Sequence, residues 1–342
     1  MEISINQSNH LKAIAIMMML CLHLFNRDYK ELFQPLIFVG QQPLTFYISL
    51  FCDACVPIFA FVSGYGLYYK YRSHQLNFIK DNQLRLRKLY INYWIIILIF
   101  PVILGFVLNK ENFPGSLGRF FLNWMAVDPS YNGAWWFFTT YVLFVLTSAF
   151  WFKVMEKLNP YLLFALLLLS YLIAFYFRIY KTDIFTNGIL KWFHRQSALY
   201  FCTLFQFMLG AMALRYDWNG YISRFFSKTR YNNLLAGMLV IFGIVFHALV
   251  PNFIIAPFTG LLFIFSFVQF NIGKWGTAIL DFLAVHATNI WLVHMFFYLI
   301  FFPKLIYAFK YPLVIFAVLV GLCLASSYII QFIEKQILKR IL

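Results

Sequence analysis

Two ionisable side chains in the first apolar run of the chain could do chemistry. Lys12 and His23 are the only ionisable residues between Leu11 and Phe25 apart from the thiol of Cys21. Either group is costly inside hydrocarbon, so a histidine there is a functional candidate. Eleven residues of α-helix turn through three turns plus about 20° and rise roughly 16 Å. One helix face would therefore carry a cation near one membrane surface and an imidazole near the other, unless the lysine only snorkels and the histidine only packs.

Asp53 is the only acidic residue well inside a predicted span, in the second apolar run. A buried carboxylate must find a partner or take up a proton. Consecutive spans usually pack together, so His23 is the expected partner, and a Tyr, Ser or Asn elsewhere is the alternative. In the first case Asp53 would orient a catalytic imidazole.

Small residues mark the expected inner end of the second span, in the run Ser63-Gly64-Tyr65-Gly66. Such residues let another backbone or a ligand come close. The sequence leaves both readings open, since helix packing explains the same pattern.

A basic loop follows this span. Arg85 and Lys88 are three residues apart and share a helix face. Together with Lys12 at the same expected membrane level, they suggest a site for phosphate groups. The alternative is that all three are the positive flanks of cytoplasmic helix ends.

Polar and aromatic residues recur farther along. Trp135 and Trp136 open the fourth predicted span, where an aromatic belt would account for them. The ninth span contains Asn289 and His294, while His286 is about 80° away from His294 around the helix. We expect no metal site from these histidines. None is expected at Cys52-x-x-Cys55 either, because this pair lies in a hydrophobic helix without a second pair.

The composition is that of a polytopic membrane protein. Of 342 residues, 63% are hydrophobic and 11% charged, against about 25% charged in globular proteins. Apolar runs of about 20 residues, the length that a bilayer core requires, recur along the whole chain. They predict an all-α bundle of about ten transmembrane helices forming one domain, 1–342, with spans at 8–26, 44–69, 89–108, 134–152, 160–177, 198–214, 234–250, 254–270, 283–302 and 311–333.

Loop charges predict the orientation. Most of the 27 Lys and Arg residues fall on one side if both termini are cytoplasmic, and the loop from Arg178 to Arg195 is the exception. The net charge of +15 therefore fits cytoplasmic loops and anionic lipid better than nucleic acid.

Several stretches, in this order, resemble the integral-membrane acyltransferase-3 family. That family's first span carries Arg, ten residues and then His, and Lys12 and His23 keep this spacing with Lys in place of Arg. Its Arg-x-x-Arg element looks like Arg85 to Lys88, again with one Lys, and Ile91 stands where Pro is common. Lysine does not reproduce the bidentate phosphate contact of arginine. The other similar runs are Pro57–Tyr65, Trp135–Trp136, Phe207–Gly210 and Ile290–His294.

The resemblance implies transfer of an acyl group, usually acetyl from acetyl-CoA, to a hydroxyl of a cell-surface carbohydrate or its lipid-linked precursor. His23 would be the essential base or an acyl relay. Acyl-CoA would be a co-substrate, with no permanently bound cofactor, and the enzyme would lie in the plasma (inner) membrane. The chain would be the stand-alone type, without an added extracytoplasmic domain.

The same resemblance assigns roles to the remaining candidates. Lys12, Arg85 and Lys88 would hold the CoA phosphates. The pantetheine arm would pass Ser63-Gly64-Tyr65 on its way to His23. The residues with acceptor-binding or structural roles would be Trp135, Trp136, Asn289 and His294.

Two functions without catalysis remain. In a proton-coupled transporter or lipid-linked glycan flippase, His23, Asp53 and His294 would form a proton relay. Internal repeats would favour that reading, and none is evident between the two halves of the sequence. In a membrane-anchoring subunit the polar residues would only join helices.

Overall fold

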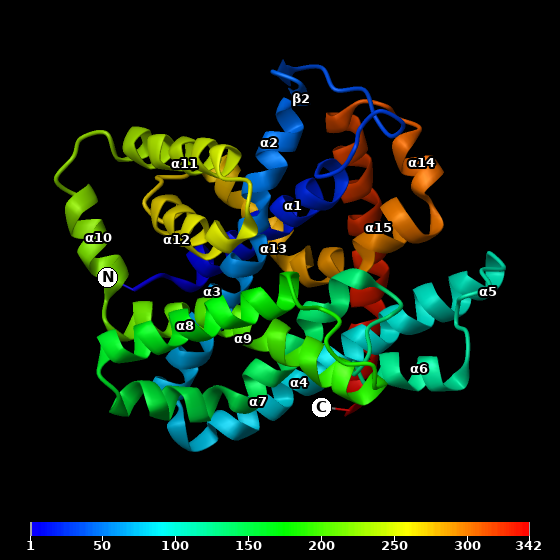
Figure 1. Ribbon diagram of the computed structural model, residues 1–342, viewed down its shortest axis with the longest axis horizontal. Helices are drawn as coiled ribbons and strands as arrows, with labels where there is room; N and C mark the ends of the chain where they lie inside the picture. Colours follow the sequence, from blue (N-terminus) through cyan, green and yellow to red (C-terminus); the bar gives the residue numbers. More distant parts are fainter. Residues whose placement is uncertain (1, 342) are drawn as a thin grey trace. The chain divides into compact units, whose positions relative to one another are not determined.

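The apolar runs form helices throughout the computed structural model, which describes residues 2–341 (Figure 1). Within these residues, nine helical stretches are long and apolar enough to cross a bilayer, which confirms the all-α membrane bundle. They are Ile5–Phe25, Leu44–Ser73, Gln75–Val107, Gly133–Lys157, Pro160–Ile179, Gly188–Arg215, Asn232–Leu249, Lys274–Phe301 and Pro312–Arg340.

The eighth predicted span, 254–270, differs from the other nine. Here the structure has only a shorter apolar helix, Phe253–Phe267, about 22 Å long against the ~30 Å of a bilayer core. Just beyond the helix, Gln269 contacts a neighbouring helix. Its side chain donates to Asn219 and accepts from Ser223.

Four of the nine long spans consist of more than one element. The complete order is α1 (Ile5–Phe25), β1 (Phe38–Val39), β2 (Gln42–Pro43), α2 (Leu44–Phe51), η1 (Cys52–Ala54), α3 (Cys55–Ser73), η2 (Gln75–Asn77), α4 (Phe78–Ile97), η3 (Leu98–Leu104), α5 (Gly105–Val107), α6 (Leu117–Trp124), η4 (Gly133–Trp135), α7 (Trp136–Lys157), α8 (Pro160–Ile179), α9 (Gly188–Arg215), α10 (Trp218–Phe226), α11 (Asn232–Leu249), η5 (Phe253–Ile255), α12 (Ala256–Phe267), α13 (Lys274–Met295), η6 (Phe296–Phe301), α14 (Pro303–Tyr307) and α15 (Pro312–Ile341).

The chain divides into two compact units, each built from three separate segments. The first unit comprises residues 1–15, 53–79 and 140–281, and the second comprises 16–52, 80–139 and 282–342. Because the segments alternate along the chain, neither unit is a continuous stretch of sequence.

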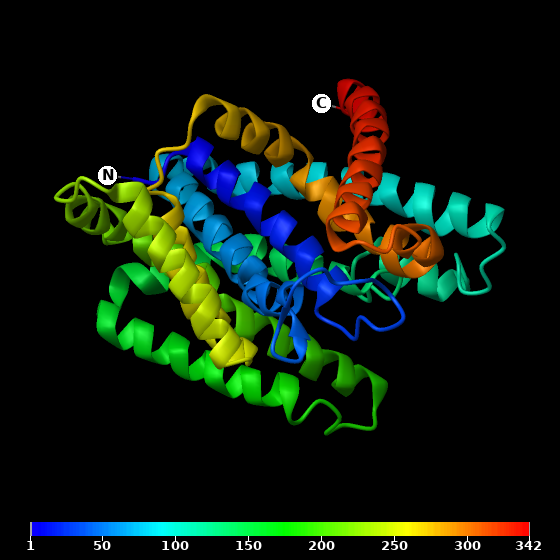
Figure 2. The same ribbon diagram turned by 90° about the horizontal axis from the view of Figure 1, so that it is seen from above.

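Close packing of α3 on α9 is the centre of the first unit. A Cβ atom on Gly64 would lie 1.7 Å from the carbonyl oxygen of Phe207, and one on Gly210 would lie 1.9 Å from that of Phe61. Only glycine allows this approach, as in other membrane helix pairs with small residues at the contact. In the same unit α8 packs along α9, and α11 lies beside α12, the yellow and gold helices of Figure 2.

Two parallel helices position the polar residues of the second unit. Asn92 of α4 bonds to Asn289 of α13, and farther along both helices Phe100 stacks on Phe296 at 4.9 Å. Both rings lie in π-helical segments, η3 and η6, which directly continue α4 and α13. Single π turns inside helices are frequent at functional sites.

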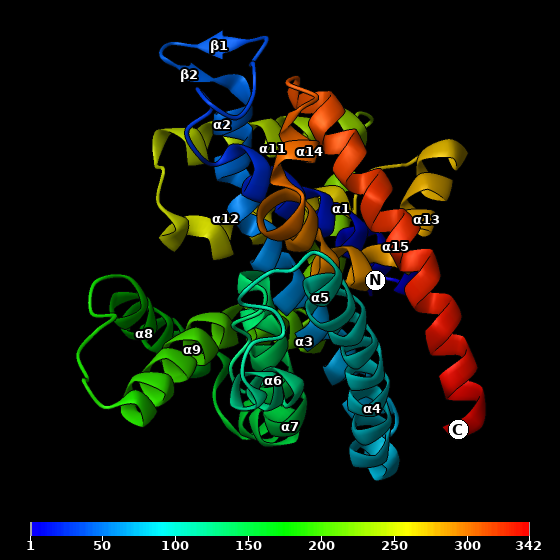
Figure 3. The ribbon, with the colours of Figure 1, turned by 90° about the vertical axis from the view of Figure 1, so that its right-hand side faces the viewer.

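The remaining elements of the second unit include its only described strands. β1 and β2 form a two-stranded antiparallel ladder directly before α2, with Phe38 opposite Pro43 (Figure 3). The chain after η6 turns through α14, which packs on α15. Gln34 donates its backbone N–H to the carbonyl of Lys310, which joins the loop after α1 to the turn before α15.

Candidate active site

Two histidines from helices far apart in the sequence meet in the second unit. The Nδ1 atom of His23, on α1, lies 2.8 Å from the Nε2 atom of His294, on α13. Their rings are nearly parallel, with an angle of 8° and centroids 5.0 Å apart. His294 is completely buried and His23 is half-buried.

The backbone of α13 determines the tautomer of His294. Its Nδ1 atom lies 2.7 Å from the carbonyl oxygen of Trp291 and 3.2 Å from that of Ile290. A carbonyl oxygen can only accept, so this nitrogen carries the proton, and Nε2 of the neutral ring is an acceptor. His23 must then donate from Nδ1 to it. The Nε2 atom of His23 is left with its lone pair, as a general base requires.

An arginine and two tyrosines complete the surroundings of this histidine pair. The ring of Tyr298 stacks on His23 and His294, with centroids 6.1 and 5.9 Å away. The Arg27 guanidinium carbon lies 5.2 Å from the centroid of the Tyr298 ring. Within the described residues, the buried Nε atom of Arg27 and the buried hydroxyl of Tyr307 have no hydrogen-bond partner. A cation with an unused donor therefore lies beside the candidate base.

The start of the fourth span holds α13 in place at the turn before His294. The indole N–H of Trp135 and the side-chain amide of Asn132 both donate to the carbonyl oxygen of Leu292, at 2.9 and 3.0 Å. In return, Trp291 donates its indole N–H to the carbonyl oxygen of Ala134. Trp135 is fully buried by these contacts, so it positions the helix and does not belong to an interfacial belt. Trp136 is half-buried and its ring contacts Phe137.

A second polar group in this unit, which we call the Asn92 cluster, contains Asn92, His286, Asn289, Ser327 and Glu334. The amide of Asn92 donates to Asn289 at 2.8 Å and to Glu334 at 3.2 Å. Asn289 donates to the hydroxyl of Ser327, which also bonds to Nδ1 of His286. Four of the five residues are more than nine-tenths buried, and polar residues in such positions of a membrane protein are functional candidates.

Comparison with known proteins identifies the family. A family model described as an acyltransferase domain matches residues 5–331 of the 342, nearly the whole chain. The chain belongs to the acyltransferase-3 family. Neither a curated protein nor a solved structure gives a match.

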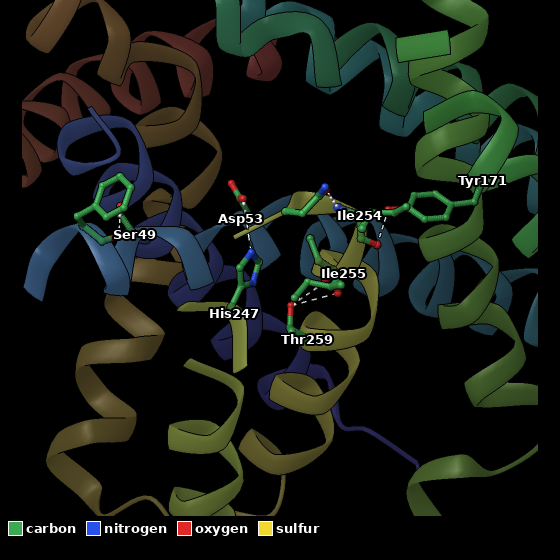
Figure 4. A network of polar contacts seen from close by, with 10 residues as sticks. Ser49, Asp53, Tyr171, His247, Ile254, Ile255 and Thr259 are labelled. Atoms are coloured by element: carbon green, nitrogen blue, oxygen red, sulfur yellow. Dashed lines mark hydrogen bonds and ion pairs between the residues drawn. The ribbon is translucent and has the colours of Figure 1, made fainter. Parts of the chain in front are cut away.

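In this acyltransferase-3 protein the expected pairing of His23 with Asp53 is replaced by two other pairs. Asp53, in η1 of the first unit, has His247 as its partner, with Oδ2 and Nε2 3.8 Å apart (Figure 4). His247 is completely buried. Sequence proximity favoured the wrong histidine, because α11 packs closely in the same unit although it follows Asp53 by almost 200 residues.

The residues expected beside the pantetheine arm have packing roles in the first unit. The Ser63 hydroxyl donates to the carbonyl of Phe59 one turn earlier, and Gly64 is the contact point of α3 with α9. The hydroxyl of Tyr65 accepts the backbone N–H of Ile3 at 2.8 Å. These contacts account for all three residues without a ligand.

The cations expected at the donor phosphates divide between the units. Lys12 is half-buried on α1 in the first unit. Arg85 and Lys88 lie on α4 in the second unit, on one face as predicted, and Lys88 is exposed. Arg85 contacts the side chain of Asn82 at 3.5 Å.

Sequence reasoning missed Arg27, Asn92 and Ser327. Arg27 follows His23 by four residues, but it lies beyond Phe25, the last residue of α1, so helical spacing gives no signal for it. Asn92 follows Lys88 by four residues and both lie on α4, so the sequence could have predicted that Asn92 continues the face of Arg85 and Lys88 into the membrane. Ser327 had no such signal in the sequence.

Proposed function

We propose that this acyltransferase-3 protein transfers an acyl group, in the first place acetyl, from cytoplasmic acyl-CoA to a hydroxyl of a cell-surface carbohydrate or its lipid-linked precursor. The observation that carries the proposal is the contact of His23 with His294. It leaves the Nε2 lone pair of His23 available, in a family whose model describes an acyltransferase domain. A neutral imidazole is the usual general base near neutral pH.

In direct transfer, His23 Nε2 takes the proton from the acceptor hydroxyl. The oxygen of that hydroxyl at the same time forms a bond to the carbonyl carbon of the thioester. The carbonyl π electrons move to oxygen, and the guanidinium of Arg27 stabilises that negative charge. Collapse of the intermediate re-forms the carbonyl and breaks the carbon–sulfur bond. The CoA thiolate leaves and takes the proton from His23, which returns the base to its starting state.

The donor would approach from the cytoplasmic side, where Arg85 and Lys88 project from one face of α4. Both cations suit phosphate groups, arginine through two parallel hydrogen bonds and lysine as a point charge. Cytoplasmic positions for both termini require an even number of crossings. The proposed topology therefore counts the short helix Phe253–Phe267 as a tenth crossing in the inner membrane.

A proton-coupled transporter or flippase is the second candidate, favoured by the contact of the part-buried Asp53 with the buried His247. These groups lie 3.8 Å apart inside two apolar helices, and such pairs occur in proton pathways. A transporter of this kind has no need to cleave a thioester. Thioester chemistry therefore separates the two functions.

The deciding experiment measures release of free CoA from acetyl-CoA by the purified protein in lipid nanodiscs, with and without added carbohydrate. Wild-type protein should release CoA, and His23→Ala should lower the rate by roughly 10²–10⁴-fold. His10→Gln is a matched control on the same helix, because His10 is bonded to Asp281 in the first unit. A wild-type rate no higher than that of His23→Ala would contradict an acyltransferase.

A cellular experiment identifies the acceptor. Surface polysaccharide from cells with and without the gene is compared by mass spectrometry, and the proposal expects a difference equal to one acyl group per modified residue. Identical masses in cells that express the protein would exclude surface carbohydrate as the acceptor.

A further inference from the structure

One buried acceptor in the Asn92 cluster has no donor. Asn92 is 7% exposed, and its amide nitrogen donates to Asn289 and Glu334. No donor among the described residues reaches its own Oδ1 atom. Rotating the amide would not help, because both partners of the nitrogen are acceptors. Buried carbonyl oxygens are nearly always paired, so this atom requires an N–H or O–H group from outside the chain.

The parallel course of α4 and α13 places this atom between the donor cations and the histidine pair. Lys88 precedes Asn92 by one turn of α4, or about 6 Å along the axis. His294 follows Asn289 by five residues of α13, or about 7.5 Å in the same direction. Since Asn92 contacts Asn289, the order along the two helices of the second unit is Lys88, then Asn92, then His294. A phosphate contact, an unpaired amide acceptor and a base succeed one another over about 14 Å.

We propose that the Asn92 cluster binds the amide-bearing arm of the acyl donor, with Asn92 Oδ1 accepting a hydrogen bond from a secondary amide N–H of pantetheine. This inference rests on the proposed function, because only an acyl-CoA donor brings pantetheine to the site. In acyl-CoA, the pantetheine arm carries two secondary amides between the diphosphate and the thioester. It therefore supplies the missing donor between the Lys88 and His294 levels.

The neighbouring groups give this subsite its selectivity. Both amide hydrogens of Asn92 are used within the cluster, so only its oxygen is offered to a ligand. The bonds from Asn289 and His286 to Ser327 hold the cluster in place. A ligand with an ester or methylene in place of the N–H would leave the acceptor unpaired. This path along α4 and α13 replaces the one past Ser63, Gly64 and Tyr65, whose contacts are all used in packing.

The experiment uses wild-type protein with two analogues of acetyl-pantetheine, each having one amide N–H replaced by oxygen. One of the two should lose roughly tenfold in kcat/KM relative to acetyl-pantetheine, because its ester oxygen leaves a buried acceptor unsatisfied. The other should behave like the parent. Since no residue is changed, folding of a variant does not enter this result.

The variant Asn92→Leu identifies the protein atom. Its kcat/KM for acetyl-pantetheine should be roughly tenfold below that of wild type. The sensitive ester analogue should cause no further loss of kcat/KM in this variant, so that the two changes are not additive. S-ethyl thioacetate, which has no amide, should react with wild type and variant alike. Gln331→Leu is the matched control, because Gln331 lies beside His286 without contacting Asn92.

Each contrary result has its own meaning. If both ester analogues react like the parent, the acceptor holds only a water molecule and the subsite is overturned while the acyltransferase stands. If Asn92→Leu lowers the rate with S-ethyl thioacetate equally, Asn92 acts through structure and the inference is again overturned. If wild type cleaves neither acetyl-CoA nor acetyl-pantetheine, the proposed function fails and the subsite fails with it.

Discussion

The imidazole rings of His23 and His294 are joined by a hydrogen bond of 2.8 Å, and the far ring is in turn bonded to the backbone of its own helix. The tautomer of the half-buried His23 is thus determined by two backbone carbonyl groups that His23 itself does not contact. In the proposed mechanism His294 would be a positioning residue, since it would act on the substrate only through His23.

Substitution of His294 tests this arrangement. In His294→Gln the side-chain oxygen can occupy the place of Nε2 and accept from His23, so much of the activity should remain. His294→Phe keeps a ring but offers no acceptor, and kcat should fall by roughly 10²–10⁴-fold with little change in KM. Steady-state kinetics of both variants, with melting temperatures as a check on folding, give the answer. Equal loss in the two variants would show that the second imidazole carries a proton and does more than position the first.

A second prediction concerns Arg27. If its guanidinium stabilises the negative charge of the tetrahedral intermediate, Arg27→Gln should lower kcat by roughly 10²–10³-fold. Arg27→Lys should recover part of the loss, because the charge is kept without the planar donors. Lys30→Gln removes an exposed cation three residues farther along and should leave kcat unchanged. The idea is wrong if Arg27→Gln raises only KM, since the charge would then bind substrate and transition state alike.

The outline of the fold could be predicted from hydrophobicity alone, and the exceptions have local causes. Nine of the ten predicted spans are long helices, because apolar runs of that length have no other stable form in a bilayer. The predicted span 254–270 is also apolar, but its helix ends at Phe267, and Gln269 bonds to α10. A pattern of hydrophobicity does not contain such a contact.

The partners of the polar residues could not be predicted from the sequence. His23 was identified because an ionisable group in an apolar run is costly wherever it packs. Its partner His294 lies 271 residues away, and no spacing rule connects two different helices. For Asp53 the rule that neighbouring spans pack together favoured His23, whereas the structure gives His247. Sequence spacing is informative within one helix and loses its meaning between helices.

The contact of α3 with α9 gives a prediction about stability. Gly64→Ala should lower the melting temperature and the yield of folded protein, because a Cβ there would lie 1.7 Å from the backbone oxygen of Phe207. Overpacking of this kind usually costs about 1–3 kcal/mol or more. Gly66→Ala is the matched control two residues away, where nothing lies within 4 Å of an added Cβ. Similar melting temperatures for the two variants would mean that the helices can separate there without cost.

For Asp53 we expect an effect on stability and not on chemistry. Asp53→Asn and His247→Leu should each destabilise the protein, and the double variant should be less affected than the sum, because each single change takes away the partner of the other side chain. The kcat of the folded fraction should stay at the wild-type value. If Asp53→Asn instead lost activity as His23→Ala does, at an unchanged melting temperature, the carboxylate would belong to the catalytic machinery.

The last prediction concerns the cations at the donor phosphates. Neutralising Arg85 or Lys88 to glutamine should raise KM for acetyl-CoA roughly 10- to 150-fold, the value of a charge-assisted hydrogen bond, with a smaller effect on kcat. These charges would contact the non-reacting end of the donor, so they bind ground and transition states equally. Lys88→Arg should be tolerated and should tighten donor binding, because the guanidinium fork suits phosphate.

The competing explanation for these cations is that they only orient the protein in the membrane. Arg87→Gln distinguishes the two, since Arg87 is an exposed cation of the same helix, α4, but points about 100° away from Lys88. A topology signal would respond to the loss of any of these charges, whereas a phosphate site would respond only on the face of Arg85 and Lys88. Donor titrations of correctly inserted variants, with acetyl-pantetheine as the donor without the nucleotide, measure the difference. If Arg87→Gln and Lys88→Gln have the same KM for acetyl-CoA, the basic face of α4 does not bind the donor. A phosphate contact would be weakened only by removal of a charge on the side of the helix that faces the phosphate.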